Sequence, residues 1–227
     1  MYHCAQLSSE LDKQGSAVIP GLLTAEECLN LSSLYERAHS LRARPGPAAE
    51  GLSLEEKYYF DPALPEPVRT LREYLYEQLA PIANRWKTAM GHAGVYPAHL
   101  QAWLDQCRRA GQTRSLSALS RHGEGDYEAL HRNANGTLVF PLQAVILLSE
   151  PKRDFTGGEL VMTEQRPRMQ SRPIVLSLRQ GDAAVIAVHD RPFQGACGIY
   201  RVTLKHGVSR VRSGRRYALD LLFHDAP

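Results

Sequence analysis

Two histidines and one arginine in the second half of the chain have the types and positions most able to do chemistry. His131 ends a segment rich in glycine and carboxylates that begins at Gly123, and His206 opens a strand, turn and strand pattern that runs to Arg216. Histidine is the commonest metal ligand in proteins, although a single histidine more often serves on the surface or in the core. The pattern predicts both histidines at the rim of a β-structured cup, with Arg216 beside His206 on the same side.

A cup of this composition suits iron(II). Iron(II) accepts imidazoles and a carboxylate on one face and keeps its other positions open for a keto acid and dioxygen. A guanidinium deeper in the cup can form a bidentate, charge-assisted contact with the distal carboxylate of that keto acid. We therefore expect His131 and His206 to act as metal ligands and Arg216 to anchor the co-substrate.

The elements that must position these residues change in character near Gly111. Before it, a capping box formed by Thr24 and Glu27 opens one helix, and apolar periodicity predicts two more over 66–90 and 98–110. After it, short apolar runs alternate with glycine and proline, which predicts seven strands over 114–119, 139–148, 159–163, 174–178, 183–187, 199–209 and 216–223. The expected fold is an all-β core with N-terminal helices, a jelly roll or small barrel.

Length and composition predict a single domain over 1–227, with 1–111 as helical support and 112–227 as the jelly-roll core. The chain is 43% hydrophobic and 22% charged, which is typical of a folded globular protein. No apolar run approaches the ~18 residues of a membrane span and no export signal is visible, so no membrane partner and a cytoplasmic location are expected. A net charge of +3 is too small to indicate a polyanion partner. Four scattered cysteines predict neither a zinc site nor a disulfide framework. The oligomeric state is left open.

An ordered set of motifs runs through the second half. It comprises Gly125-Asp126-Tyr127 with His131, the run from Leu138 to Gln143, Phe155-Thr156-Gly157-Gly158-Glu159, the run from Thr163 to Ser171, and His206-Gly207-Val208 with Gly214 and Arg216. With these motifs, residues 112–225 resemble the Fe(II)/2-oxoglutarate-dependent dioxygenases. The resemblance is to the prolyl-hydroxylase-like branch and to a bacterial group described as oxidative demethylases of damaged nucleic acid.

This resemblance implies a double-stranded β-helix that uses Fe(II), 2-oxoglutarate as co-substrate and dioxygen. It also implies that Arg216, ten residues after His206, holds 2-oxoglutarate. Tyr127 is expected either to donate its hydroxyl to the keto acid or to pack in the core. The implied reaction couples decarboxylation of 2-oxoglutarate to oxidation of a substrate C–H bond, by hydroxylation or oxidative demethylation.

One position departs from the family pattern. The first motif, His-x-Asp in the family, reads His131-Arg132-Asn133 here. Three hypotheses follow: an oxygenase in which Asn133 binds the metal or leaves a water-filled position, a radical halogenase in which halide takes the place of the carboxylate, and a catalytically silent or trapped variant that acts as a binding module. Nearby carboxylates that could substitute are Asp126, Glu128 and Glu159, the last more suited to supporting the barrel mouth.

The substrate is the least determined part of the sequence. Residues 41–56 match the family poorly and have the composition of a flap. The aromatic cluster 58–60 is flanked by Lys57 but also by acidic residues, which does not favour a nucleic-acid surface. We therefore expect a small molecule or an amino acid derivative, with a nucleobase in nucleic acid as the alternative. His189 and Asp190 form a potential dyad, but Pro192 and Gly195 predict a loop there, so His206 is the expected ligand.

Overall fold

Two antiparallel sheets face each other in the structure, a computed structural model that describes residues 4–38, 53–54, 56–60, 64–196 and 198–227. The major sheet has the order β1 (Ser16–Ile19), β11 (Ala183–Ala187), β7 (Leu142–Leu147), β15 (Arg216–Leu222), β5 (Ala118–His122) and β3 (Glu56–Tyr59). The minor sheet has the order β10 (Arg172–Leu176), β9 (Leu160–Gln165), β13 (Gly198–Val208), β6 (Tyr127–His131) and β2 (Ser53–Leu54), and β12 (Asp190–Gly195) also pairs with β13. Two short pairs complete the described strands: β14 (Val211–Gly214) with β8 (Phe155–Gly157), and β16 (Asp225–Ala226) with β4 (Arg114–Ser115).

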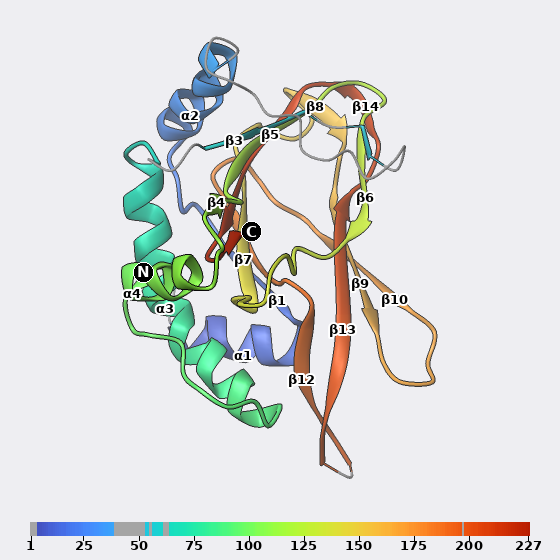
Figure 1. Cartoon of the computed structure of the whole chain (residues 1–227). Helices are drawn as coiled ribbons and strands as arrows, with labels where there is room; N and C mark the ends of the chain where they lie inside the picture. The colour runs from blue at the N-terminus through green and yellow to red at the C-terminus, as the bar shows by residue number, and fades with distance from the viewer. Residues whose placement is uncertain (1–3, 39–52, 55, 61–63, 197) are drawn as a thin grey trace.

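Helices cover the outer side of the major sheet, as Figure 1 shows. They are α1 (Cys4–Gln14), α2 (Ala25–Ala38), α3 (Val68–Ala89) and α4 (Leu100–Arg109). The expected capping box is present at the start of α2: Glu27 donates its backbone N–H to the Thr24 hydroxyl at 3.2 Å, and Thr24 donates its own to the Glu27 carboxylate at 2.7 Å. The predicted β core with N-terminal helices is confirmed.

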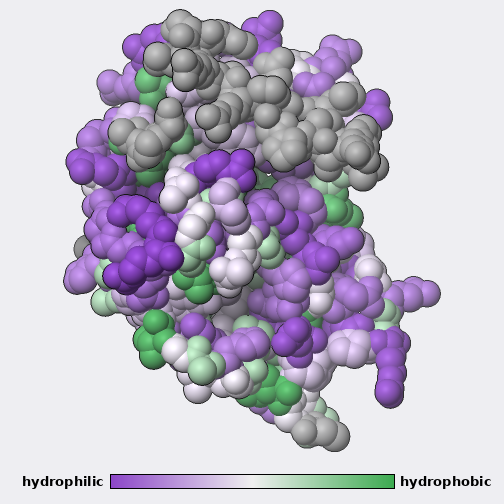
Figure 2. Space-filling view, viewed as in Figure 1, coloured by the Kyte–Doolittle hydropathy of each residue, from purple (hydrophilic) through white to green (hydrophobic). Residues whose placement is uncertain are grey.

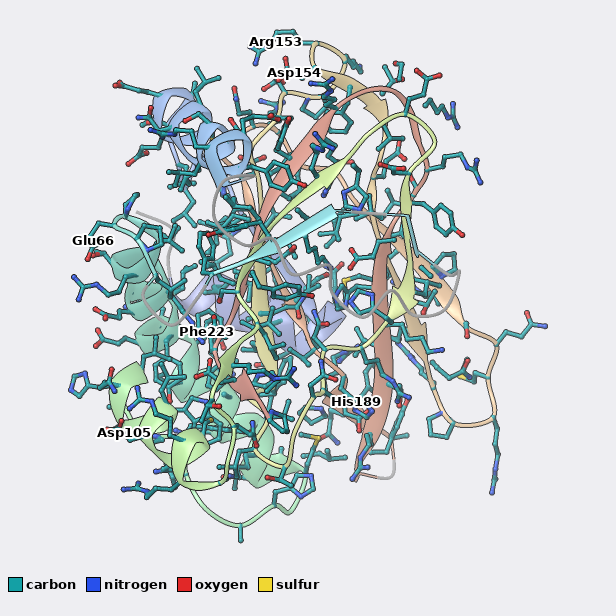
Figure 3. All side chains as sticks on the ribbon, turned by 45° about the horizontal axis from the view of Figure 1, so that its top comes forward. Glu66, Asp105, Arg153, Asp154, His189 and Phe223 are labelled. Atoms are coloured by element: carbon teal, nitrogen blue, oxygen red, sulfur yellow. The ribbon has the colours of Figure 1, made fainter. Side chains whose placement is uncertain are left out.

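Aromatic side chains join the helices to the major sheet. Phe223, labelled in Figure 3, lies between them, and the rings of Phe140 and Phe223 are 5.4 Å apart between centroids. Tyr76 of α3 packs against Phe140 at 4.9 Å. Strands β7 and β11 are buried at every residue because helices cover one face and the opposite sheet covers the other. Their sequences are therefore apolar throughout, apart from Gln143 in β7.

The N-terminal part is more than a helical support. Strand β1 pairs with β11 at the edge of the major sheet, and β2 and β3 pair with β6 and β5 respectively. The loop predicted around 190–195 was wrong, because these residues form β12. Strands β6, β8 and β14 were not predicted either. Most of the predicted flap, 41–52, lies outside the described residues.

The segment from β2 to β3 connects the two sheets across the mouth of the barrel. Ser53 pairs with Glu128 of the minor sheet, and Lys57 pairs with Ser120 of the major sheet. The chain thus passes from one sheet to the other within a few residues. We call residues 53–54 and 56–59 the strap. Because its two ends are hydrogen-bonded to different sheets, the strap sets how far the sheets stand apart at this end.

The surface in the view of Figure 2 is mostly hydrophilic, with hydrophobic atoms in small separate groups. None of the described helices combines the length and the apolar composition that crossing a bilayer requires. Cys28 and Cys107 are buried free thiols.

Candidate active site

His131 and His206 lie directly opposite each other on neighbouring strands. They are a register pair of β6 and β13, and their ring centroids are 4.4 Å apart. His206 is only 2% exposed, whereas about a third of the His131 side chain is exposed. The two imidazoles that the sequence singled out are therefore brought together, although 75 residues separate them along the chain.

A small pocket of about 50 Å³ lies between the sheets beside His206. Its lining includes Lys57, Glu128, Asn133, His206 and Arg216. Arg216 begins β15 on the major sheet and is 1% exposed, so its guanidinium approaches the pocket from the wall opposite the histidines. This volume has room for a few water molecules. A larger ligand therefore requires side chains at the mouth to move.

The ring of His131 is held by a backbone contact. Its Nδ1 lies 3.0 Å from the carbonyl oxygen of Ala129, and because a carbonyl can only accept, Nδ1 is the donor. Nε2 is then the nitrogen that the neutral form of the ring can offer to a metal, and it lies 3.5 Å from Oε1 of Glu128. A hydrogen bond to one ring nitrogen that leaves the other as a donor of electrons is the usual arrangement of a metal-binding histidine.

His206 belongs to a chain of amide contacts. Asn133 donates from Nδ2 to Oε1 of Gln143 at 2.8 Å, and Nε2 of Gln143 lies 3.0 Å from Nε2 of His206. Gln143 therefore donates to the lone pair of the imidazole. Burial, followed by the neighbouring His131, lowers the pKa of His206 to about 3, so the ring is neutral. Nδ1 of His206 is buried and has no hydrogen-bond partner among the described residues.

This network determines which atom of Asn133 faces the histidine. Its amide nitrogen, Nδ2, lies 3.4 Å from Nε2 of His206. An amide nitrogen has no lone pair available for a metal, so Asn133 in this arrangement does not offer the oxygen ligand expected at position 133. Gln143 was not identified from the sequence as a functional residue. It is the single strongly polar residue in the buried strand β7, and this could have marked it as a candidate.

Glu128 and Lys57 form an ion pair inside the pocket. Nζ of Lys57 and Oε1 of Glu128 are 2.5 Å apart, and the side chains are 14% and 9% exposed. Burial acts to raise the pKa of Glu128, but the Lys57 ammonium and the two nearby histidines outweigh burial and hold that pKa well below its usual range. Glu128 is therefore an ionised carboxylate. Lys57 was not identified as a site residue from the sequence.

The other two candidate carboxylates lie elsewhere. Asp126 accepts a hydrogen bond from the backbone of Gly123 at 2.7 Å and stabilises a turn. Glu159 accepts from the Ser209 hydroxyl at the exposed surface. Of the three carboxylates considered, Glu128 alone lines the pocket.

Two glycines make room for Arg216. A Cβ atom at Gly158, where φ is +64°, would approach Cδ of Arg216 to 3.0 Å. At Gly157, a Cβ would come within 2.4 Å of the backbone oxygen of Arg210. Gly158 therefore lets the chain lie close to the stem of Arg216, which restricts the position of the guanidinium, and Gly157 lets β8 lie close to β14.

Tyr127 lies on β6 next to the mouth and is partly buried. The guanidinium carbon of Arg210 lies 5.6 Å from the centre of its ring. Tyr127 is not part of the pocket lining, so its contact with a keto acid stays a prediction. His189 lies outside the pocket lining and is labelled in Figure 3; its Nδ1 contacts Asp190 at 2.8 Å.

The donor set fits iron(II) in part. His131 and His206 supply two imidazoles, which are ligands of the type that iron binds. Among the described residues, however, no three side chains of His, Cys, Asp or Glu are already gathered in a geometry that holds a metal ion. The identity of the third protein ligand is therefore the open point of this site.

The sequence profile of an oxygenase family, Oxygenase-NA, described as catalysing oxidative methylation of damaged DNA, matches residues 55–226. The chain belongs to this family. Two uncharacterised Mycobacterium tuberculosis proteins, MT2286 of strain CDC 1551 / Oshkosh and Rv2227 of strain ATCC 25618 / H37Rv, are each 45% identical to it over 159 residues, 70% of this chain and 68% of the relative.

Solved structures with low sequence identity share the fold of this Oxygenase-NA member. A prolyl-4-hydroxylase from Pseudomonas putida aligns with a TM-score of 0.59 at 14% identity, covering 99% of this chain and all of that one. A 2OG-Fe(II) oxygenase family protein from Burkholderia pseudomallei aligns at 0.56 and 18%, covering 99% and 92%. A Trichoplax adhaerens prolyl hydroxylase, in complex with a hypoxia inducible factor peptide, aligns at 0.57 and 15%, covering 98% and 89%. The expected double-stranded β-helix is confirmed by these solved structures, and the family match shows that the chain is an oxygenase.

Proposed function

We propose that His131 and His206 bind the catalytic iron of this oxygenase and that Arg216 binds the distal carboxylate of 2-oxoglutarate. The observation that carries the proposal is the pairing of the two imidazoles at 4.4 Å, with Arg216 lining the pocket that His206 lines. When bound, iron with 2-oxoglutarate and dioxygen supplies the oxidation of a substrate C–H bond, coupled to decarboxylation of the keto acid.

The protein residues perform the positioning. The Ala129 carbonyl holds the His131 ring so that Nε2 faces Oε1 of Glu128, a residue of the pocket lining. Gln143 instead donates to Nε2 of His206 and fixes that ring from the other nitrogen, so a metal at this lone pair would have to displace the Gln143 N–H. Arg216, buried against Gly158, is limited in the directions it can take and so favours a forked contact with one carboxylate. Val145, Leu160 and Leu222 give the pocket an apolar wall, which limits the access of water to the bound co-substrate.

The test is anaerobic assembly of the full chain with iron(II) and 2-oxoglutarate, followed through the weak visible charge-transfer absorption of the chelate. Wild type is expected to develop the band, and His206→Ala is expected to lose it. His99→Ala serves as the matched control, because His99 is exposed on the helical side, where its Nδ1 contacts Glu77. A band of equal intensity in His206→Ala and wild type would contradict the proposal.

The halogenase alternative has less support from the geometry. Halide must occupy the position that the family's carboxylate vacates, but here the amide of Asn133 points toward His206 and is fixed by Gln143. The silent alternative is tested by the same band. The mass of the product formed with and without chloride distinguishes the halogenase from the oxygenase, because only a halogenase incorporates chlorine into product.

For the substrate, we propose a damaged or methylated base in nucleic acid. The family description names damaged DNA. The exposed arginines 132, 210 and 212 lie in or beside the strands of the pocket mouth, and Tyr127 offers a ring under Arg210. Cations beside an aromatic ring are the elements of single-strand binding. The small molecule or amino acid derivative expected from the sequence stays the alternative, and the small volume of the pocket is consistent with it.

These substrate classes separate in one assay. Succinate release is measured with single-stranded oligonucleotides carrying N-methylated bases and, in parallel, with a panel of amino acid derivatives. A nucleic-acid substrate is expected to stimulate release at low salt and to lose the stimulation as salt rises, because phosphate contacts release counterions. Stimulation by the amino acids alone would instead establish the small-molecule alternative.

A further inference from the structure

We propose that Glu128 is the third protein ligand of the metal and replaces the carboxylate that position 133 lacks. This inference rests on the metal site of His131 and His206 proposed above. It assigns the ligand to a residue three positions before the first histidine, on the same strand, where the family pattern has a residue two positions after it.

A β-bulge makes this assignment possible. Side chains alternate between the faces of a regular strand, so residues 128 and 131 would point to opposite faces. In the structure, His131 pairs with His206 and Glu128 pairs with Val208, so a three-residue step on β6 faces a two-residue step on β13. The extra residue of β6 changes the alternation locally. As a result Oε1 of Glu128 lies 3.5 Å from Nε2 of His131.

The two facing atoms can both supply an electron pair to a metal. Nδ1 of His131 donates its hydrogen to the Ala129 carbonyl, so Nε2 is the nitrogen that the neutral form of the ring offers to a metal. The carboxylate oxygen also has only lone pairs to offer. A cation that contacts both atoms would satisfy them. His206 on the adjacent strand would supply a third donor once these side chains shift toward the ion, because they are not gathered around a metal position in the metal-free protein. Asn133, by contrast, directs its amide nitrogen toward His206.

A cation already occupies one side of this arrangement. The Lys57 ammonium contacts the same Oε1 atom at 2.5 Å within the pocket. We interpret Lys57 as a stand-in for the metal: it balances the charge of Glu128 in the metal-free protein and withdraws when a divalent ion binds. The flexible stem of lysine permits this withdrawal without a change in the backbone of β3.

Cobalt(II) binding to the full chain tests the assignment without reference to turnover. Co(II) affinity is measured by calorimetry, and its visible absorption reports the donor set. Glu128→Gln is expected to weaken Co(II) at least tenfold relative to wild type, and Asn133→Ala to change it less than threefold. Glu159→Gln is the matched control, since that carboxylate is exposed and lies outside the pocket lining; it is expected to bind as wild type does.

A rescue variant guards against simple misfolding of the pocket. In the double variant E128Q/N133D the carboxylate returns to the family position, and Co(II) affinity is expected to recover to within threefold of wild type. A further variant, Lys57→Met, is expected to raise Co(II) affinity in the wild-type background and to leave it unchanged beside E128Q, because Lys57 acts through Glu128.

The outcomes separate this inference from the proposed function. If Glu128→Gln binds Co(II) as tightly as wild type, or if Asn133→Ala loses as much as Glu128→Gln, Glu128 is not the ligand. If N133D binds Co(II) and wild type does not, the histidine site stands and only the assignment of Glu128 fails. If neither wild type nor N133D binds Co(II), the histidine site itself is refuted.

Discussion

Gly207 and Glu128 approach each other so closely that a Cβ atom at position 207 would lie 2.4 Å from the backbone oxygen of Glu128. The same Cβ would also come within 3.1 Å of Ala129. Position 207 stands opposite the bulge, between the two register pairs that define it. Glycine is therefore required here so that β13 can lie against the bulged part of β6, and the bulge in turn places Glu128 beside His131.

Gly207→Ala is expected to push β6 away from β13 and to separate Glu128 from the histidines. Overpacking of this kind costs about 1–3 kcal/mol in stability. Co(II) affinity is expected to fall more than tenfold, measured by calorimetry beside a thermal melt. Gly123→Ala is the control, because a Cβ there makes only an ordinary contact at 3.4 Å with Asp126. Unchanged Co(II) binding in Gly207→Ala would show that the bulge does not position the site.

Arg216→Leu is expected to weaken 2-oxoglutarate specifically. A hydrogen bond to a charged group contributes about 1.5–3 kcal/mol, which corresponds to roughly a 10- to 150-fold rise in the dissociation constant. Binding is measured by titrating 2-oxoglutarate into the Co(II)-loaded protein, while Co(II) affinity is expected to stay within threefold. Arg215→Leu, an exposed neighbour on the same strand connection, is the matched control. Equal effects of both variants would assign the loss to net charge rather than to Arg216.

Gln143→Leu is expected to have opposite effects in the two states of the protein. Without metal, the change leaves the Asn133 amide and the His206 lone pair without their shared partner and costs about 1–3 kcal/mol. With metal, the lone pair of His206 is used and no longer needs Gln143. The melting temperature of metal-free Gln143→Leu should therefore fall, and its rise on adding Co(II) should exceed that of wild type. A smaller rise would show that Gln143 supports the metal-bound form.

Glu164 is enclosed between two arginines, Arg191 at 2.5 Å and Arg166 at 2.7 Å. Burial acts to raise the pKa of Glu164, but the hydrogen bonds from the two arginines outweigh it and lower that pKa below 4.5. The pair therefore stabilises the fold above pH 4.5, and this stability is lost as pH falls through the lowered pKa.

Glu164→Gln is expected to destabilise the protein at pH 7 by about 3–5 kcal/mol, because it leaves Arg191 buried without its counter-charge. The difference from wild type should shrink in acid, where Glu164 of the wild type becomes protonated. Urea unfolding at pH 7 and at decreasing pH measures this convergence. Parallel stability curves at all pH values would show that the ion pair does not carry the effect. Arg191 also binds the carbonyl oxygens of Asp12 and Lys13 at the end of α1, so it joins that helix to the sheet.

The sequence is sufficient to predict those features that depend on residues close together in the chain. Arg216 follows His206 by a strand, a turn and a strand, and such a hairpin brings its ends together whatever the rest of the chain does. The capping box of α2 is equally local, since Thr24 and Glu27 are three residues apart. The β core and the N-terminal helices are recognisable for the same reason.

Other parts depend on contacts that no local pattern reveals. Lys57 meets Glu128 across 71 positions, and their pairing depends on how the strap crosses the mouth. The bulge on β6 reverses the side on which Glu128 would be expected. Strand β12 was missed because Pro192 and Gly195 suggest a loop, yet β12 is an edge strand that pairs only with β13, where proline is tolerated.

The strap couples metal binding in the pocket to the arrival of a substrate at the mouth. Lys57 is part of β3, and a divalent ion would seek the same carboxylate oxygen that Lys57 now holds. Metal binding at that oxygen and attachment of the strap are therefore linked. Detachment of β3 raises the affinity of the site for the ion, and bound ion favours detachment of β3 by the same factor. A substrate that displaces the strap would therefore strengthen metal binding at the site where that substrate is to react.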